Sequence, residues 1–146
     1  HYCSRRQRQM CIRDSPTSVR VAMEDAESRG SHIFLDYLNY SSPSKDEGAW
    51  ILDLMRACVK ESGIREVHSH VEVFDGTVSP AGFAAVVLID ESHVTAHCYS
   101  DEGLLAIDVF TCGPHDPEHV VKLIHDGLVS GINGVTLARK ERVNRF

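Results

Sequence analysis

The segment that decides the fold runs Glu91-Ser92-His93-Val94-Thr95-Ala96-His97 and, after a short turn, Gly103-Leu104-Leu105-Ala106-Ile107-Asp108-Val109-Phe110-Thr111-Cys112-Gly113. Both halves have the composition of strands, and the turn Ser100-Asp101-Glu102-Gly103 precedes the second half, which predicts an antiparallel hairpin. The segment also places a serine, two histidines and a thiol in apolar surroundings, where polar groups are costly unless they are satisfied or used. It is therefore a candidate site as well as part of the fold.

Further strands and two helices surround this hairpin. Strands are predicted over residues 31–40, 64–74, 83–90 and 135–143. The first helix is predicted to have Ser44 as its N-cap and Glu47 at its third position, and to end at Gly63. The second is predicted to begin at Asp116-Pro117-Glu118. This order predicts an α+β fold, a two-layer sandwich in which helices cover one face of an antiparallel sheet.

Composition limits the class of protein. The chain has 146 residues, 42% of them hydrophobic, which suits one compact domain. Neither a membrane-length apolar run nor a signal peptide is present, so we expect a cytoplasmic protein without a membrane partner. Five cysteines without C-x-x-C spacing argue against a disulfide framework and a four-thiolate zinc site. The net charge of −6 argues against a nucleic-acid partner for the folded body.

The first 22 residues differ from the rest. Residues 1–20 hold five arginines and show no periodic apolar pattern. We predict that residues 1–22 are a non-native or disordered leader and that Met23 is a candidate start, and we exclude them from the fold. The alternative is a basic arm that binds nucleic acid.

The central segment carries a resemblance to a known family. The order Glu91-Ser92-His93, the histidine five residues after Ser92, and the strand from Ala106 to Gly113 resemble the short bacterial and archaeal S-adenosylmethionine decarboxylases. The resemblance extends from Gly30 to Val143. It implies an S-adenosylmethionine decarboxylase-like fold, with one domain over residues 30–146 that cleaves itself between Glu91 and Ser92 into chains of residues 1–91 and 92–146. It also implies a homodimer with active sites near the subunit interface.

The resemblance further implies a role for each reactive residue. The Ser92 hydroxyl attacks the Glu91 carbonyl, and the pyruvoyl group derived from Ser92 then forms a Schiff base with the substrate amine. His97 assists the self-cleavage, and Cys112 returns a proton to the substrate carbon. The implied reaction converts S-adenosylmethionine to its decarboxylated form, the aminopropyl donor for spermidine biosynthesis. No metal and no pyridoxal phosphate are expected, because a pyruvoyl group supplies the electron sink.

The chain departs from the common pattern of that family at two places. Ala84 stands where a serine or threonine eight residues before the cleavage serine aids self-cleavage. Cys98-Tyr99-Ser100-Asp101 stands where the pattern has Thr-Trp-Pro-Glu. The resemblance implies that Tyr99 and Asp101 bind substrate in their place. Since relatives use arginine or ornithine, a pyruvoyl-dependent arginine or ornithine decarboxylase is the alternative within the family.

Two functions of other classes stay open at this point. His68, His70, His93 and His97 suit a metal-dependent α+β enzyme, although surface histidines are the simpler explanation for the first two. Ala84 is compatible with an uncleaved, non-catalytic partner subunit. Each reactive residue also has a structural explanation: Ser92 as a hydrogen-bonded surface group, His97 as a core histidine and Cys112 as a small buried side chain.

The spacing of Ser92 and His97 creates a geometric difficulty. Residues five apart in a regular strand face opposite sides of the sheet, so the two side chains share a site only if Ser92 lies at a strand edge, turn or bulge. Asp108 and Cys112, four apart, are expected to share a face.

Overall fold

The computed structural model describes residues 28–146. The predicted leader, residues 1–22, and Met23 lie outside the described residues. The described chain forms six strands, two α-helices and one short 3-10 helix. In chain order they are β1 (Gly30–Leu38), α2 (Glu47–Glu61), β2 (Glu66–Phe74), β3 (Gly82–Ile89), β4 (Ser92–Tyr99), η1 (Ser100–Glu102), β5 (Leu104–Cys112), α3 (Pro117–Gly131) and β6 (Thr136–Arg145).

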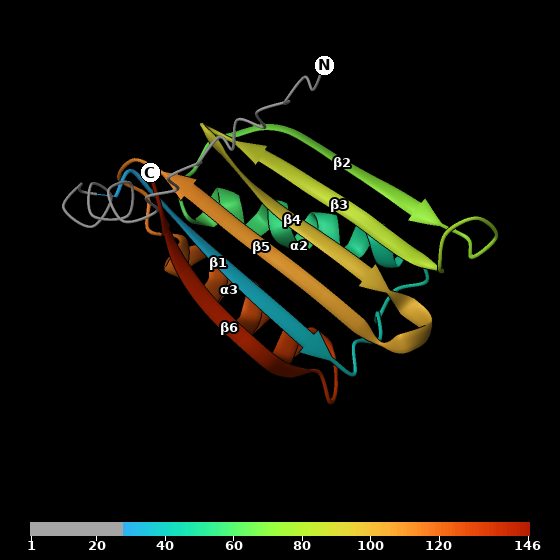
Figure 1. The fold of residues 1–146 in the computed structure, drawn as a ribbon. Coiled ribbons are helices and arrows are strands. Elements are labelled where there is room, and N and C mark those ends of the chain that lie inside the picture. Colours follow the sequence, from blue (N-terminus) through green and yellow to red (C-terminus); the bar gives the residue numbers. More distant parts are fainter. Residues whose placement is uncertain (1–27) are drawn as a thin grey trace, which may run out of the picture.

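The strands form one antiparallel sheet in the order β2-β3-β4-β5-β1-β6. Both helices lie against the same face of this sheet (Figure 1). The predicted two-layer α+β sandwich is confirmed, as is the β4–β5 hairpin, whose turn is η1. The first strand does not pair with the second, because β1 lies between β5 and β6 and therefore joins segments far apart in sequence.

Helix α2 begins later than predicted. Its N-cap is Asp46, whose carboxylate accepts a hydrogen bond from the Ala49 N–H at 3.0 Å. The Ser44 hydroxyl instead accepts the N–H of Asp46, in the turn before the helix. The prediction of Ser44 as N-cap was wrong because Asp46 satisfies a free donor of the first turn. Gly63 was correctly predicted at the far end, where it follows the C-cap residue with a φ of 73°.

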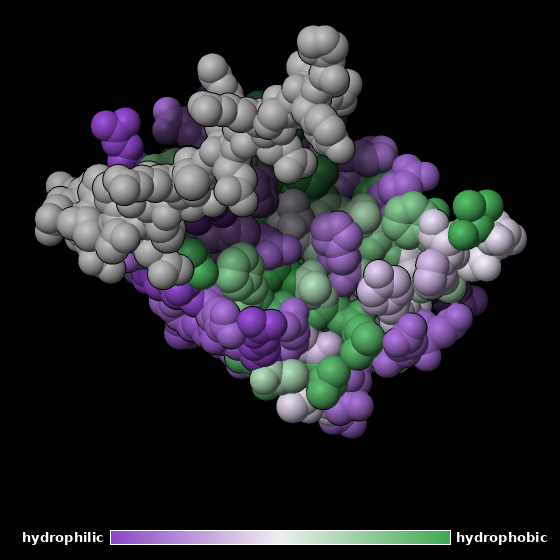
Figure 2. Space-filling model, in the orientation of Figure 1, coloured by the Kyte–Doolittle hydropathy of each residue, from purple (hydrophilic) through white to green (hydrophobic). Residues whose placement is uncertain are grey.

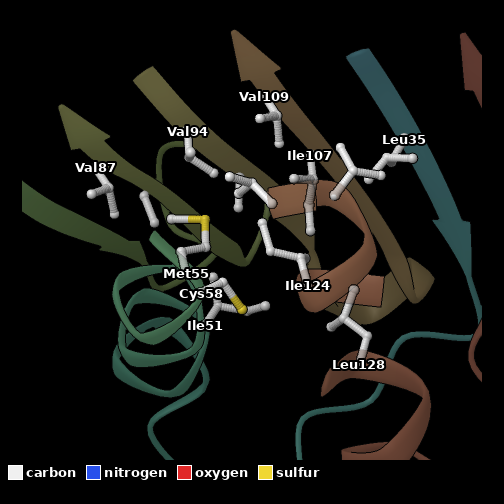
Figure 3. Packing of buried hydrophobic residues seen from close by; sticks show 14 of the residues in the cluster. Leu35, Ile51, Met55, Cys58, Val87, Val94, Ile107, Val109, Ile124 and Leu128 are labelled. Atoms are coloured by element: carbon white, nitrogen blue, oxygen red, sulfur yellow. The ribbon is translucent and has the colours of Figure 1, made fainter. Parts of the chain in front are cut away.

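The core lies between the sheet and the helices. On β4 and β5 it takes every second residue: Val94, Ala96 and Cys98, and Leu105, Ile107 and Val109. They pack against Ile51, Met55, Cys58 and Val59 of α2 and against Val120, Val121, Ile124 and Leu128 of α3 (Figure 3). Because the pleat sends alternate residues to opposite sides, the intervening residues lie on the other face.

We call the face opposite the helices the open face. Within the described residues no helix covers it, and both apolar and polar side chains are exposed on it (Figure 2). It carries Leu88 of β3, His97 and Tyr99 of β4, and Asp108 and Cys112 of β5. Asp108 and Cys112 share this face, as predicted. Neither helix of the described chain has the length and apolar character needed to cross a membrane.

Candidate active site

Ser92 lies at the end of a strand, directly after a tight turn. Ile89 of β3 pairs with Ser92, so Asp90 and Glu91 are the two residues of the turn. Glu91 has a φ of 58°. This left-handed conformation costs a non-glycine residue roughly 1–2 kcal/mol. The bond between Glu91 and Ser92 thus involves a strained residue, and Ser92 is the first residue of β4, directly after the turn.

The Ser92 hydroxyl is held by the neighbouring strand. Its oxygen accepts a hydrogen bond from the Cys112 backbone N–H at 2.8 Å. Because that bond uses a lone pair, the serine proton remains available to a base. Glu91 and Cys112, together with Arg29, line an open hollow of about 520 Å³. The structure therefore brings Glu91, Ser92 and Cys112 together at one end of the sheet.

Sequence analysis did not single out Thr111, which anchors the loop after Cys112. Thr111 is only 2% exposed, the one buried polar residue of the described chain. Its hydroxyl donates to the His115 carbonyl oxygen at 2.8 Å, while the Gly113 N–H donates to the Arg29 carbonyl oxygen at 3.1 Å. A hydroxyl at a core position is costly unless it is hydrogen-bonded. A threonine in phase with the apolar residues of a strand is therefore the signal by which the sequence could have pointed to Thr111. Thr111 thus fixes the backbone on the C-terminal side of the thiol.

His97 and Tyr99 lie at the opposite end of β4. His97 pairs with Ala84 of β3 and with Ala106 of β5, and it faces the open side. His97 is five residues from Ser92, or roughly 16 Å along the strand. Side chains alternate between the two faces along β4, and Ser92 is in phase with the residues that face the helices, whereas His97 faces the open side. Within one chain, Ser92 and His97 therefore do not lie together.

The end of β4 that carries His97 has a hollow of its own. His97 and Tyr99 line a mainly apolar space of about 220 Å³ together with Asp36, Leu38 and Leu104. Asp101 is exposed within η1 and is not among the lining residues. The predicted site residues therefore form two groups, one at each end of the sheet.

A second polar cluster lies on the open face, one row from Cys112. The His32 Nε2 atom lies 3.4 Å from an Asp108 carboxylate oxygen and, although buried, has no hydrogen-bond partner. The Thr95 hydroxyl donates to the other Asp108 oxygen at 3.4 Å. The His93 ring stands edge-on to His32, with centroids 5.9 Å apart. Partial burial, and then proximity to His32, lower the pKa of His93 below its ordinary 6.5.

The other polar clusters do not assemble a site. Within residues 28–146 no three side chains of His, Cys, Asp or Glu gather closely enough to hold a metal ion, and His68 and His70 lie on the edge strand β2. A hollow of about 530 Å³ at the end of α2 is lined by Arg56, Lys60 and Glu66, and none of its lining residues is a serine, threonine, cysteine or histidine.

The sequence was next compared with known proteins. The sequence profile described as S-adenosylmethionine decarboxylase matches residues 31–140. The chain belongs to this family. The match includes both groups of site residues, and no comparison supports a metal-dependent enzyme or a non-catalytic subunit.

Individual members of the family share moderate identity with the chain. The S-adenosylmethionine decarboxylase proenzyme of Aquifex aeolicus is 31% identical over 108 residues, which are 74% of this chain and 75% of that protein. The proenzyme of Persephonella marina is 30% identical over 100 residues, 65% of this chain and 72% of that protein. The crystal structure of the Aquifex aeolicus adenosylmethionine decarboxylase superposes with a TM-score of 0.66 at 26% identity, covering 82% of this chain and 92% of that one.

Proposed function

We propose that this protein is a self-processing S-adenosylmethionine decarboxylase whose pyruvoyl group derives from Ser92. Family membership supports the reaction, and the arrangement at Glu91, Ser92 and Cys112 supports the processing. The observation that carries the proposal is the serine hydroxyl directly after a strained turn residue and hydrogen-bonded to the backbone N–H of Cys112. Arginine and ornithine decarboxylation remain alternatives only for the substrate.

The self-cleavage follows from the chemistry of this turn. The Ser92 oxygen adds to the Glu91 carbonyl carbon, the peptide C–N bond breaks, and an ester joins the two residues. A base then removes the Ser92 α-proton, which expels the Glu91 carboxylate and leaves a dehydroalanine. Water hydrolyses this group with loss of ammonia, leaving a pyruvoyl group at the start of the second chain. The Cys112 N–H that faces the serine oxygen stabilises negative charge developing there.

The strand order allows this cleavage without loss of the fold. The first product chain would contribute β1, β2 and β3, and the second β4, β5 and β6. In the sheet, β1 of the first chain lies between β5 and β6 of the second. The two chains would therefore remain paired along three strand boundaries after the turn is cut.

The pyruvoyl group, when formed, bonds covalently to the substrate amine and accepts the electron pair released with carbon dioxide. Cys112 is the proposed proton donor to the substrate carbon. Its thiol lies near Gly30, where an added methyl group would come within 3.3 Å of the sulfur. Glycine at that position thus leaves room beside the thiol on the β1 side of β5. We expect Cys112→Ala to be cleaved normally and to lose ~10²-fold or more in turnover.

We further propose a homodimer that forms through the open face. His97 is the proposed base for processing, yet it lies at the wrong end of its own strand to reach Ser92. In a two-fold pairing of open faces, the His97 end of one copy can lie against the Ser92 end of the other. Tyr99 and Asp101, the proposed substrate-binding residues, would then approach the same site. Exposed apolar side chains on this face, among them Leu38 and Leu88, support a covering partner.

Mixing two inactive variants tests this arrangement. Ser92→Ala and His97→Asn should each remain uncleaved when produced alone. Produced together, mixed dimers contain one complete site, so the His97→Asn chain should be cleaved while the Ser92→Ala chain stays intact. Intact-mass measurement distinguishes the two chains. Cleavage of His97→Asn alone would contradict the role of His97, and no cleavage in the mixture would contradict the shared site.

The substrate is tested separately. Release of labelled carbon dioxide should be measured in parallel from S-adenosylmethionine, arginine and ornithine. We expect release from S-adenosylmethionine only, without added metal or pyridoxal phosphate. Preferential release from arginine or ornithine would move the protein to the alternative substrate class, and a chain that never cleaves would contradict the pyruvoyl proposal.

A further inference from the structure

We propose that Ser100 is a positioning residue, which orders the substrate-binding end of β4 through the carboxylate of Glu47. We call residues 99–103 the η1 corner, because they contain Tyr99, the 3-10 helix and Gly103. The inference rests on the proposed function only in assuming that this corner contacts S-adenosylmethionine. The bonds themselves are independent of that assumption.

Ser100 joins the η1 corner to two other parts of the chain. Its hydroxyl donates to the carboxylate of Glu47, the first residue of α2. Its backbone N–H donates to the Ala81 carbonyl oxygen at 3.0 Å, in the loop that precedes β3. The Gly103 N–H in turn donates to the Ser100 carbonyl oxygen at 3.2 Å, which closes the turn. All three hydrogen-bonding groups of this serine are therefore used.

The Ser100–Glu47 hydrogen bond lies beside buried, uncharged side chains. The Cys98 sulfur lies 3.7 Å from the Ser100 oxygen, and Cys98 is 5% exposed. Burial raises the pKa of this thiol to about 11, so it is uncharged at neutral pH and does not compete as an anion. Tyr40, 3% exposed, packs nearby, and its N–H donates to the Gly103 carbonyl oxygen at 2.9 Å. Ser100 and Glu47 are themselves partly buried, and a hydrogen bond to an ionised carboxylate is roughly twice as strong as one between neutral groups.

Close packing leaves the corner little freedom to compensate for a lost bond. At Gly82, a side-chain carbon would lie 1.9 Å from the Cys98 carbonyl oxygen, so the backbones of β3 and β4 meet directly there. Tyr99, by contrast, is half exposed and lines the open-face hollow with His97. Ser100 thus connects a rigid buried side to an exposed residue that is free to contact a ligand.

The position also differs from the pattern that the chain resembles, which has proline there. Proline has neither a hydroxyl nor an N–H to donate. The bonds to Glu47 and Ala81 are consequently specific to a serine at this place. These two hydrogen bonds restrain the backbone at this position, as the ring of a proline does covalently.

The test compares Ser100→Ala, Ser100→Thr and Glu47→Ala with the control Glu61→Ala, an exposed acid at the other end of the same helix. For Ser100→Ala we expect a ~10-fold increase in KM for S-adenosylmethionine, with kcat and the cleavage rate within about twofold. Glu47→Ala and the double variant should match it, because all three remove one bond. Ser100→Thr and Glu61→Ala should behave as the unmodified protein.

Hydrogen exchange supplies a readout that needs no turnover. In uncleavable Ser92→Ala protein, the Gly103 amide should exchange faster when Ser100→Ala is added, and not when Glu61→Ala is added. Unchanged exchange would overturn the ordering role, and faster exchange with an unchanged KM would overturn the role in substrate binding. Absence of carbon dioxide release from unmodified protein would instead contradict the proposed function, while the exchange result would still decide whether Ser100 orders the corner.

Discussion

Apart from Ser92, which is in phase with the covered residues of β4 but lies at the turn where that strand begins, the two faces of the sheet separate stability from chemistry. On the helix-covered face, β3, β4 and β5 contribute fully buried aliphatic side chains such as Val87, Val94 and Ile107. On the open face, the same strands carry His97, Asp108 and Cys112. Because one pleated strand serves both faces, adjacent residues can have unrelated roles. Within the paired part of each strand, the side of the sheet that a residue faces therefore indicates its role better than its position along the sequence, whereas Ser92 owes its role to its place after the turn.

Removing the nucleophile should have the largest effect on the chemistry and little on the fold. Ser92→Ala is expected to abolish cleavage, because no other hydroxyl lies at the Glu91–Ser92 bond. Intact-mass measurement after prolonged incubation should show one chain, and circular dichroism should show a native spectrum. A variant that still splits at Glu91 would refute the mechanism.

Truncating neighbouring valines compares the two faces directly. Val87→Ala on the covered face should lower the free energy of unfolding by about 2–3 kcal/mol, through lost burial and a cavity. Val86→Ala on the open face should cost less than about 1 kcal/mol, measured by urea unfolding at low protein concentration. If Val86→Ala instead lowers the free energy of unfolding by more than this, and the loss grows with protein concentration, a second copy covers Val86 on the open face. Equal losses of unfolding free energy for Val87→Ala and Val86→Ala in dilute protein would contradict the difference between the two faces.

Restoring a hydroxyl beside His97 should accelerate processing. Ala84 lies directly opposite His97, so Ala84→Ser places an oxygen where it can orient the imidazole. We expect cleavage ~10-fold faster, equivalent to one net hydrogen bond, in a time course of intact mass. The matched control is Ala106→Ser, on the other side of His97. Equal acceleration by both would show that a hydroxyl at the Ala84 position has no special role.

The smallest expected effect is a pH dependence at His93. Its lowered pKa means that, below its ordinary value of 6.5, the unfolded chain binds a proton at His93 more readily than the folded one. Stability from this group is therefore complete above that value and is lost as the pH falls. His93 faces His32, Asp108 and Arg145, so their charges contribute to the slope.

The measurement is the urea midpoint at about pH 7.5 and about pH 5.5. His93→Gln should reduce the difference between the two midpoints, whereas His119→Gln, at an exposed position of α3, should not. An unchanged difference in His93→Gln would contradict the pKa shift.

Much of this fold could be predicted from sequence because its signals are local. Alternation along β4 and β5 predicted the hairpin, and the Asp116-Pro117 start predicted α3. The start of α2 was wrong by two residues, since both Ser44 and Asp46 can cap a helix and only the folded turn selects between them. The insertion of β1 between β5 and β6 was not predicted, because strand order depends on contacts between distant segments.

By itself, the sequence determined the family, and it indicated the residues proposed to react, since Glu91, Ser92, His97 and Cys112 form a motif whose chemistry depends on residue type and spacing. Only the tertiary structure decided how they are arranged. It placed the Ser92 hydroxyl on the Cys112 N–H and His97 at the far end of the same strand, and it bound Ser100 to Glu47. The reason is physical: pleat and register fix which side chains meet, and register forms only when separate strands pair.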